Sequence, residues 1–303
     1  MNEYEIYKKS LGNVPTFLNK YLELDIVQRL KGISLLCGMD YASRAAYDFD
    51  YYISRYDHSL NVALITWNMT HDKTQTLAGL FHDISTPVFS HVIDYLNHDY
   101  VNQESTEEKT KEILNSSWEL KKYLNEDGIK FDDICDFKKY SVVDLERPSL
   151  CADRLDGTLA AGINWTKTVS GLEASRIIDN LFLTKNEKGK DEIAFKDEEC
   201  ALTFTSVNDT INKASHSNVD NFMMNLLSDI VRDAINLKIV DYESLFYITE
   251  EEFIECVEDN LDLSEELNRK WYLFKNVKEF PKMEYPKVKN KIINPLVVDK
   301  RLK

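Results

Sequence analysis

The chain has 303 residues and a formal net charge of −15, so its surface as a whole repels phosphate backbones and a duplex nucleic acid is not expected as its main partner. Hydrophobic residues make up 43% of the chain, and only nine Gly and six Pro interrupt it, which favours a mostly α-helical globular fold. The five Cys are scattered and never spaced as CxxC, and no apolar run approaches the ~18 residues of a membrane span. We therefore expect a cytoplasmic protein that does not enter a membrane.

The first elements are predicted from helical periodicity. Residues 21–38 carry apolar side chains at helical spacing and predict a helix that ends at Gly38. A second helix is expected from about Ser59, with His58 at its start. A third ends where His82 and Asp83 precede a bend at Pro87.

Another helix is expected after Pro148, where Asp153, Arg154 and Asp156 stand among Leu and Ala residues. Charges in so apolar a helix need partners. One interpretation is an ion pair between Arg154 and an aspartate. The other is that Asp153 binds a metal and Arg154 faces an anion.

The C-terminal half predicts a β-hairpin near 180–196 and then helices over 198–240. Residues 250–266 contain nine acidic and no basic residues, whereas 269–303 contain eleven basic and three acidic ones. These blocks are solvated faces, or they dock on each other or across a subunit boundary. We expect one domain over 1–265, a basic C-terminal extension over 266–303, and a possible homo-oligomer.

Histidines and aspartates occur in the order H…HD…D, at His58, His82, Asp83 and Asp153. Imidazole and carboxylate together suit a divalent ion such as Mn, Fe, Ni, Co, Mg or Zn. Taken alone, the His82–Asp83 pair could equally be a core histidine beside a helix-capping aspartate. Because 70 residues separate Asp83 from Asp153, only a helical bundle can bring the set together.

Three local motifs resemble those of the HD-domain superfamily of metal-dependent phosphohydrolases. RYDHSLNVA is similar to its R-[FY]-x-H-S-L-x-V, HDISTPVFSH to its H-D-I-G-H-G-P-F-S-H, and CADRLD to its D-[KR]-x-D. The segment QRLKGISLLCG is also similar to a motif of the branch that contains the deoxynucleoside triphosphate triphosphohydrolases. The resemblance extends from about residue 28 to about residue 260 and implies an HD-domain helical bundle.

The resemblance also implies roles for individual residues. A metal would be held by His58, His82, Asp83 and Asp153, and catalytic roles fall to His91, Asp94 and Asp83. The substrate phosphate would meet Arg55, Arg154 and His91, and Lys213 is a further candidate for offsetting phosphate charge.

Several positions depart from the family pattern. The first phosphate-facing histidine is replaced by Thr86, and the general-acid histidine by Gln103, which cannot donate a proton in that way. His98 is a possible substitute. Sugar-facing positions are occupied by Leu35 and Gly157, which offer no side-chain hydrogen bond.

The function expected from these features is hydrolysis of a nucleotide or related phosphate ester by metal-activated water. The alternative is a catalytically reduced module that binds metal and nucleotide for regulation, because the general acid is missing. A weaker third hypothesis places single-stranded nucleic acid on the basic tail.

Overall fold

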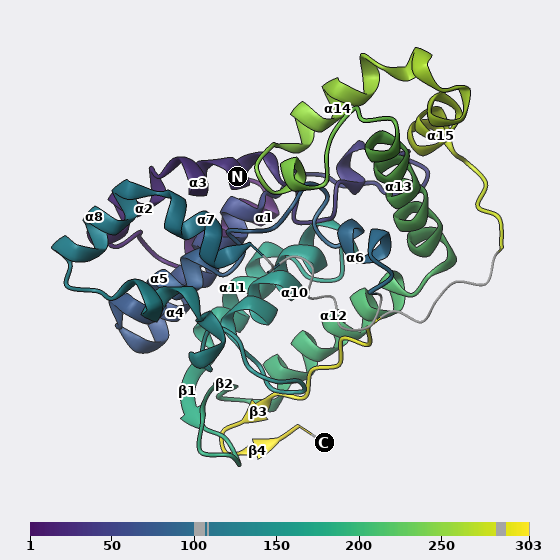
Figure 1. The fold of residues 1–303 in the computed structure, drawn as a ribbon. Helices are drawn as coiled ribbons and strands as arrows, with labels where there is room; N and C mark the ends of the chain where they lie inside the picture. Colours follow the sequence, from purple (N-terminus) through teal and green to yellow (C-terminus); the bar gives the residue numbers. More distant parts are fainter. Residues whose placement is uncertain (100–106, 108, 283–288, 303) are drawn as a thin grey trace.

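The computed structural model describes residues 1–99, 107, 109–282 and 289–302. As the composition predicts, the described chain is mostly helical, with one small sheet that lies beside the C-terminus in space (Figure 1). In chain order its α-helices are α1 Glu3–Ser10, α2 Asn19–Leu22, α3 Asp25–Gln28, α4 Arg55–Thr70, α5 Lys73–Phe81, α6 Val92–Leu96, α7 Thr110–Ser116, α8 Trp118–Glu126, α9 Phe131–Cys135, α10 Ala152–Asn164, α11 Gly171–Asp179, α12 Glu198–Ser215, α13 Asn218–Asn236, α14 Glu250–Glu258 and α15 Glu265–Asn276. The strands are β1 Leu181–Lys185, β2 Asp191–Phe195, β3 Leu296–Val297 and β4 Lys300–Arg301.

Helix α4 begins one turn earlier than its apolar periodicity predicts. Ser54 and Asp57 form a capping box, in which each side chain accepts a hydrogen bond from the other residue's backbone N–H. The helix therefore begins at Arg55 and not near Ser59. As a result, Arg55 and His58 both lie in its first turn, on a rigid element.

The prediction of one helix over residues 21–38 is wrong. The segment contains only the short helices α2 and α3 and a 3₁₀ turn at Arg29–Gly32. At Ile33 and Ser34 the chain is extended, since Leu35 N–H donates to the Ile53 carbonyl at 2.9 Å and Arg55 N–H to the Ile33 carbonyl at 2.8 Å, and residues 35–38 then form a turn. Pairing with the segment that precedes α4 replaces the helical hydrogen bonds there.

The predicted hairpin is confirmed, and the C-terminal extension enlarges it. Strands β1 and β2 pair in antiparallel register from Leu181 opposite Phe195 to Lys185 opposite Asp191. Strand β3 then pairs parallel to β2, and β4 antiparallel to β3. The last residues therefore belong to the same sheet as the hairpin.

Helix α4 lies between two other helices that carry candidate ligands. Its Val62 joins a buried cluster with Leu155 of α10, and its Ala63 joins a second cluster with Leu77 of α5. This packing brings the first turns of α4 and α10 to the C-terminal end of α5. Three helix ends, distant in sequence, meet at one place.

The acidic and basic blocks contact each other within the chain. Lys275 of α15 lies 2.5 Å from Glu258 of α14, and Trp271 of α15 also donates to that carboxylate. Helix α15 packs on α13 through the buried Trp271 and Phe274. None of the helices in the described part of the chain is long and apolar enough to cross a lipid bilayer.

Candidate metal centre

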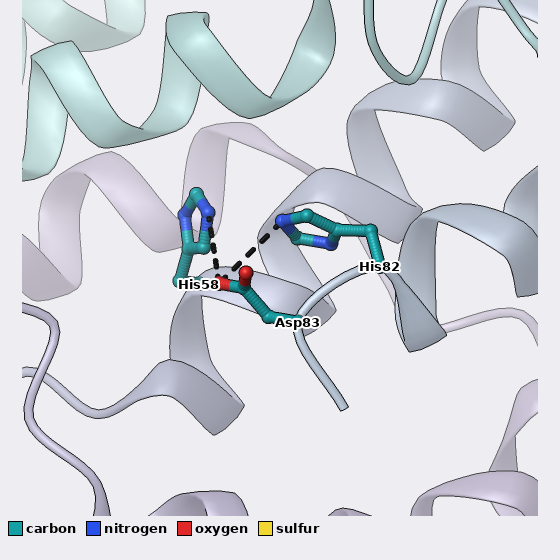
Figure 2. Close-up of side chains that lie close together, drawn as sticks. All are labelled: His58, His82 and Asp83. Atoms are coloured by element: carbon teal, nitrogen blue, oxygen red, sulfur yellow. Dashed lines mark ion pairs between the residues drawn. The ribbon is translucent and has the colours of Figure 1, made fainter. Parts of the chain in front are cut away.

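The structure brings the four predicted metal ligands together: Figure 2 shows His58, His82 and Asp83, and Asp153 lies beside both histidines. The Asp83 Oδ2 atom lies 3.7 Å from His58 Nε2 and 3.6 Å from His82 Nε2. The Asp153 Oδ1 atom lies 3.1 Å from His58 Nε2 and 3.7 Å from His82 Nε2. Two imidazole nitrogens and two carboxylate oxygens thus face a common centre.

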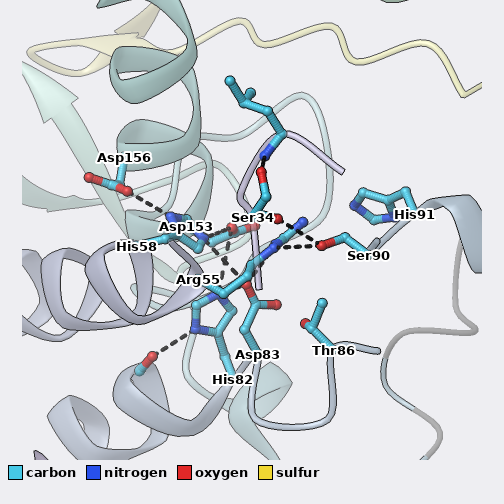
Figure 3. A network of polar contacts seen from close by, with 12 residues as sticks. Ser34, Arg55, His58, His82, Asp83, Thr86, Ser90, His91, Asp153 and Asp156 are labelled. Carbon is cyan, nitrogen blue, oxygen red and sulfur yellow. Dashed lines mark hydrogen bonds and ion pairs between the residues drawn. The ribbon is translucent and has the colours of Figure 1, made fainter. Parts of the chain in front are cut away.

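Hydrogen bonds on the far side of each ring fix which nitrogen faces that centre. His58 Nδ1 lies 2.6 Å from the Asp156 carboxylate, and His82 Nδ1 lies 2.7 Å from the Gly79 carbonyl oxygen (Figure 3). Both partners are acceptors, so each Nδ1 carries a proton and each Nε2 is the nitrogen that faces the centre. In the described structure the buried Nε2 of His82 makes no hydrogen bond.

These residues fit a divalent metal ion. Ligand bonds of about 2.1 Å place ligands at right angles about 3 Å apart, and the four contacts above run from 3.1 to 3.7 Å. The unpartnered nitrogen of His82 is a buried polar atom that a cation would satisfy. Nitrogen and oxygen donors in this mixture suit the divalent ions named above.

The electrostatics of the site favour ionised carboxylates. Burial alone would raise the pKa of Asp83, but the charges of Arg55 and the two imidazoles hold it well below its usual range. The pKa of Asp153 is lowered in the same way by both histidines. Burial alone would lower the pKa of His58, yet its carboxylate partners raise it to about 10. A bound cation would therefore displace protons from the imidazoles.

Arg55 links the centre to the loop after α5. Its Nη1 atom lies 2.7 Å from Asp83 Oδ2, and its Nε–H donates to Ser90 Oγ at 3.2 Å (Figure 3). The Ser90 hydroxyl donates in turn to the Ser34 carbonyl. The guanidinium is thus held beside the carboxylate that would bind the metal.

The other candidate residues lie at different places. Arg154 pairs with Asp144 at 3.0 Å, and its guanidinium also donates to the Ser149 carbonyl. His91 Nδ1 lies 2.9 Å from the carboxylate of Asp94, which is fully buried. Both interpretations of the charged helix α10 thus hold in part, since Arg154 does pair with an aspartate while Asp153 joins the histidines.

A cavity of about 350 Å³ opens beside the centre. Its lining includes the four candidate ligands together with Arg55, His91 and Arg154. Lys213 is exposed on α12 and is not among the lining residues, so the structure does not place it at the substrate phosphate. His98 is exposed and does not line the cavity, and Gln103 falls outside the described residues.

Asp156 is the functional residue that sequence reasoning did not assign. Its carboxylate binds His58 and also accepts hydrogen bonds from Tyr7 at 2.6 Å and Asn61 at 2.9 Å. It lies three residues after Asp153 on α10 and is fully buried. The signal for this role was the second acidic residue of CADRLD, which i, i+3 spacing puts on the same helix face.

Comparison with known proteins gives two distant relatives and no matching protein-family profile. The chain is 28% identical over 184 residues to the uncharacterized protein YdhJ of Bacillus subtilis, a match that covers 60% of this chain and 52% of YdhJ. It is 24% identical over 251 residues to the metal-dependent phosphohydrolase cns2 of Cordyceps militaris, covering 82% of this chain and 70% of that protein. The chain thus matches about half the length of the first relative.

Proposed function

We propose that this protein is a metal-dependent phosphohydrolase of the HD-domain superfamily, acting on a nucleotide or a related phosphate ester. The observation that carries the proposal is the pair of imidazoles whose Nε2 atoms face Asp83 and Asp153 while their Nδ1 atoms are held by acceptors. The distant relative named a metal-dependent phosphohydrolase supports the same chemistry. The position of the site in the wall of a cavity gives a substrate access to it.

The protein's own residues would orient and neutralise the phosphate. When bound, a divalent ion supplies a Lewis acid for a phosphoryl oxygen and lowers the pKa of water. Arg55 and Arg154 would offset the phosphate's negative charge. His91 holds a proton on Nδ1 for Asp94 and so offers Nε2 to the cavity as an acceptor. Burial lowers the pKa of His91, which favours its neutral form.

The remaining cavity wall supports a nucleotide substrate. Tyr47, Phe49 and Trp165 line it, and the Tyr47 ring lies 5.3 Å from Phe49 and 6.2 Å from Trp165 between centroids. Aromatic faces of this kind can stack a planar base. Leu35 and Gly157 also line the cavity and cannot read a sugar hydroxyl through a side-chain hydrogen bond.

Metal analysis combined with a phosphate-release screen tests the reaction. Nucleoside mono-, di- and triphosphates are incubated with wild type and with His58→Asn, and His71→Asn is the matched control because Asn tolerates the left-handed φ of 52° at His71. We expect about one metal ion per chain in wild type and in the control, and loss of metal and turnover in His58→Asn. Equal metal content in all three proteins would refute the site.

A turnover comparison on matched ribo- and deoxyribonucleotides tests the substrate part of the proposal. A site that hydrogen-bonds a hydroxyl can reject an analogue by ~10⁴-fold, whereas an apolar wall discriminates weakly. With Leu35 and Gly157 in the wall, we expect less than about a thousandfold preference between the two sugars. A larger preference would show that other residues read the sugar.

A further inference from the structure

The C-terminal segment forms part of the cavity wall. Lys291 N–H donates to Asn212 Oδ1 at 2.9 Å, and Asn208 Nδ2 donates to the Lys291 carbonyl at 3.0 Å, so α12 holds this residue on both sides. Three residues later Asn294 N–H donates to the Pro148 carbonyl at 2.8 Å. In Figure 1 the yellow segment runs along α12 on its way to β3. The backbone around Lys291 is therefore fixed in position.

A second cationic side chain, that of Arg147, lies in the same part of the cavity wall as Lys291. Arg147 also lines the cavity, and its Nη1–H donates to the carbonyl of Ile292, the residue after Lys291. Within the described residues, neither Arg147 nor Lys291 forms an ion pair with a carboxylate. By contrast, Arg55 is paired with Asp83 and Arg154 with Asp144.

The surroundings of these two cations leave their charge poorly compensated. Burial lowers the pKa of Lys291, and the neighbouring Arg147 lowers it further. Burial and the charge of Arg154 also lower the pKa of Arg147, and the attraction of Asp153 and Asp144 only partly offsets them. Asp220 attracts Lys291 only from beyond ion-pair distance, and its carboxylate accepts a hydrogen bond from the Tyr47 hydroxyl. Two buried positive charges without ion-pair partners are unfavourable in free energy, and an anion bound by both cations would lower that free energy.

We propose that Arg147 and Lys291 form a second phosphate-binding subsite in the cavity, separate from the metal centre and completed by the C-terminal segment. This inference rests on the proposed function, because it assigns a second phosphate group to the same substrate. Guanidinium and ammonium groups held on fixed backbone bind phosphate oxygens by charge-assisted hydrogen bonds. The preferred substrates would carry two or more phosphates, as in a polyphosphate chain or a bisphosphate.

Calorimetric binding of inorganic tripolyphosphate to the full chain, without added metal, tests the subsite directly. Lys291→Met and Arg147→Met should each weaken binding by about tenfold or more, the usual worth of a hydrogen bond to a charged group. Lys213→Met is the matched control, since Lys213 is exposed outside the cavity, and it should bind as wild type does. Lys291→Arg should retain most of the affinity.

A measurement on wild type does not depend on how the variants fold. Tripolyphosphate should slow acetylation of Lys291, followed by mass spectrometry, and leave that of Lys213 unchanged. Unaltered affinity in both methionine variants, or no protection of Lys291, would overturn the subsite. If binding is lost in the variants while no phosphate ester is hydrolysed, the subsite stands and the proposed phosphohydrolase activity falls.

Discussion

At the level of single residues, the candidate metal centre depends on partners behind its ligands. His58 is oriented by the Asp156 carboxylate and His82 by the Gly79 carbonyl. Without these acceptors either ring could place its proton on Nε2 and lose its ability to bind a metal. The Asp156 carboxylate is in turn held by Tyr7 and Asn61, so a shell of buried hydrogen bonds fixes the ring of His58.

Replacing Asp156 by asparagine should weaken metal binding. The amide of Asp156→Asn cannot accept from His58, Tyr7 and Asn61 as the carboxylate does, so the ring of His58 loses its fixed orientation. We expect metal affinity to fall by about 10- to 100-fold, measured by competition with a chelator. Tyr7→Phe removes one donor but keeps the carboxylate, and should have a smaller effect. Wild-type affinity in Asp156→Asn would contradict this role.

Glu250 is a second buried residue whose environment has a measurable consequence. Its Oε1 atom accepts from Phe89 N–H at 3.3 Å, and its Oε2 atom has no partner in the described structure. Burial raises the pKa of Glu250 to about 8, and the charge of Asp40 acts in the same direction. The folded protein therefore holds a proton that the unfolded chain releases at lower pH.

This proton makes stability depend on pH. An unfolded glutamate titrates near 4.5, so between about pH 4.5 and 8 the native state binds more protons and stability falls as pH rises. Above pH 8 both states are ionised and the loss is complete. Glu250→Gln should therefore gain stability relative to wild type from pH 5 to 8 and then level off, as measured by urea unfolding. The exposed Glu251→Gln should show a constant difference, and parallel profiles for Glu250→Gln would refute the assignment.

At the level of elements, the C-terminal strands are attached to the hairpin by a buried ion pair. Glu192 of β2 is fully buried, and Arg301 of β4 pairs with it while also reaching Glu187 at 2.8 Å. Leu150 N–H and the Asn186 amide donate to the same Glu192 carboxylate. The pair therefore joins the end of the chain both to the hairpin and to the segment that precedes α10.

Replacing only Arg301 should destabilise the protein more than replacing both Arg301 and Glu192. Arg301→Met leaves a buried charge on Glu192 without its cation, which costs about 3 kcal/mol. Adding Glu192→Gln removes the charge and should recover most of that loss, as measured by chemical denaturation. Additive losses in the double variant would mean that the two side chains do not act as a pair.

At the level of the whole molecule, the chain places its charges so that opposite signs meet. The acidic α14 is paired with the basic C-terminal end of α15 by Glu258 and Lys275 within one chain. A homo-oligomer remains a prediction that this pairing neither requires nor opposes. At the metal centre, the carboxylates of Asp83 and Asp153 both face the two imidazoles, so a bound cation would meet two negative charges.

Metal should therefore stabilise the native state as a whole. An ion that binds only the folded chain adds about 2.7 kcal/mol when present at a hundred times its dissociation constant. Adding Mn²⁺ should raise the thermal midpoint of wild type and should not raise that of His82→Ala. An equal rise in both proteins would show that the ion binds elsewhere.

The sequence alone identified the features that depend on neighbouring residues. The order of His58, His82, Asp83 and Asp153, the hairpin near 180–196 and the helical character follow from local motifs and periodicity. Their assembly in a helical bundle was expected from spacings too wide for a local metal loop, and the resemblance implied the same bundle. The start of α4 also depends on neighbouring residues, because Ser54 and Asp57 form its capping box. The apolar periodicity of the helix nevertheless predicted a start one turn later.

Only the tertiary structure decided which distant groups meet. Asp156 reaches His58 across 98 positions, and Asn208 reaches Lys291 across 83. The pairing of residues 33–35 with 53–55 likewise prevents the helix that the apolar periodicity of residues 21–38 predicts. Periodicity and capping report on residues within a few turns of one another, whereas hydrogen bonds between remote segments depend on how the helices pack. The tautomers at the metal centre and the positions of the cations in the cavity wall both depend on such contacts between remote segments.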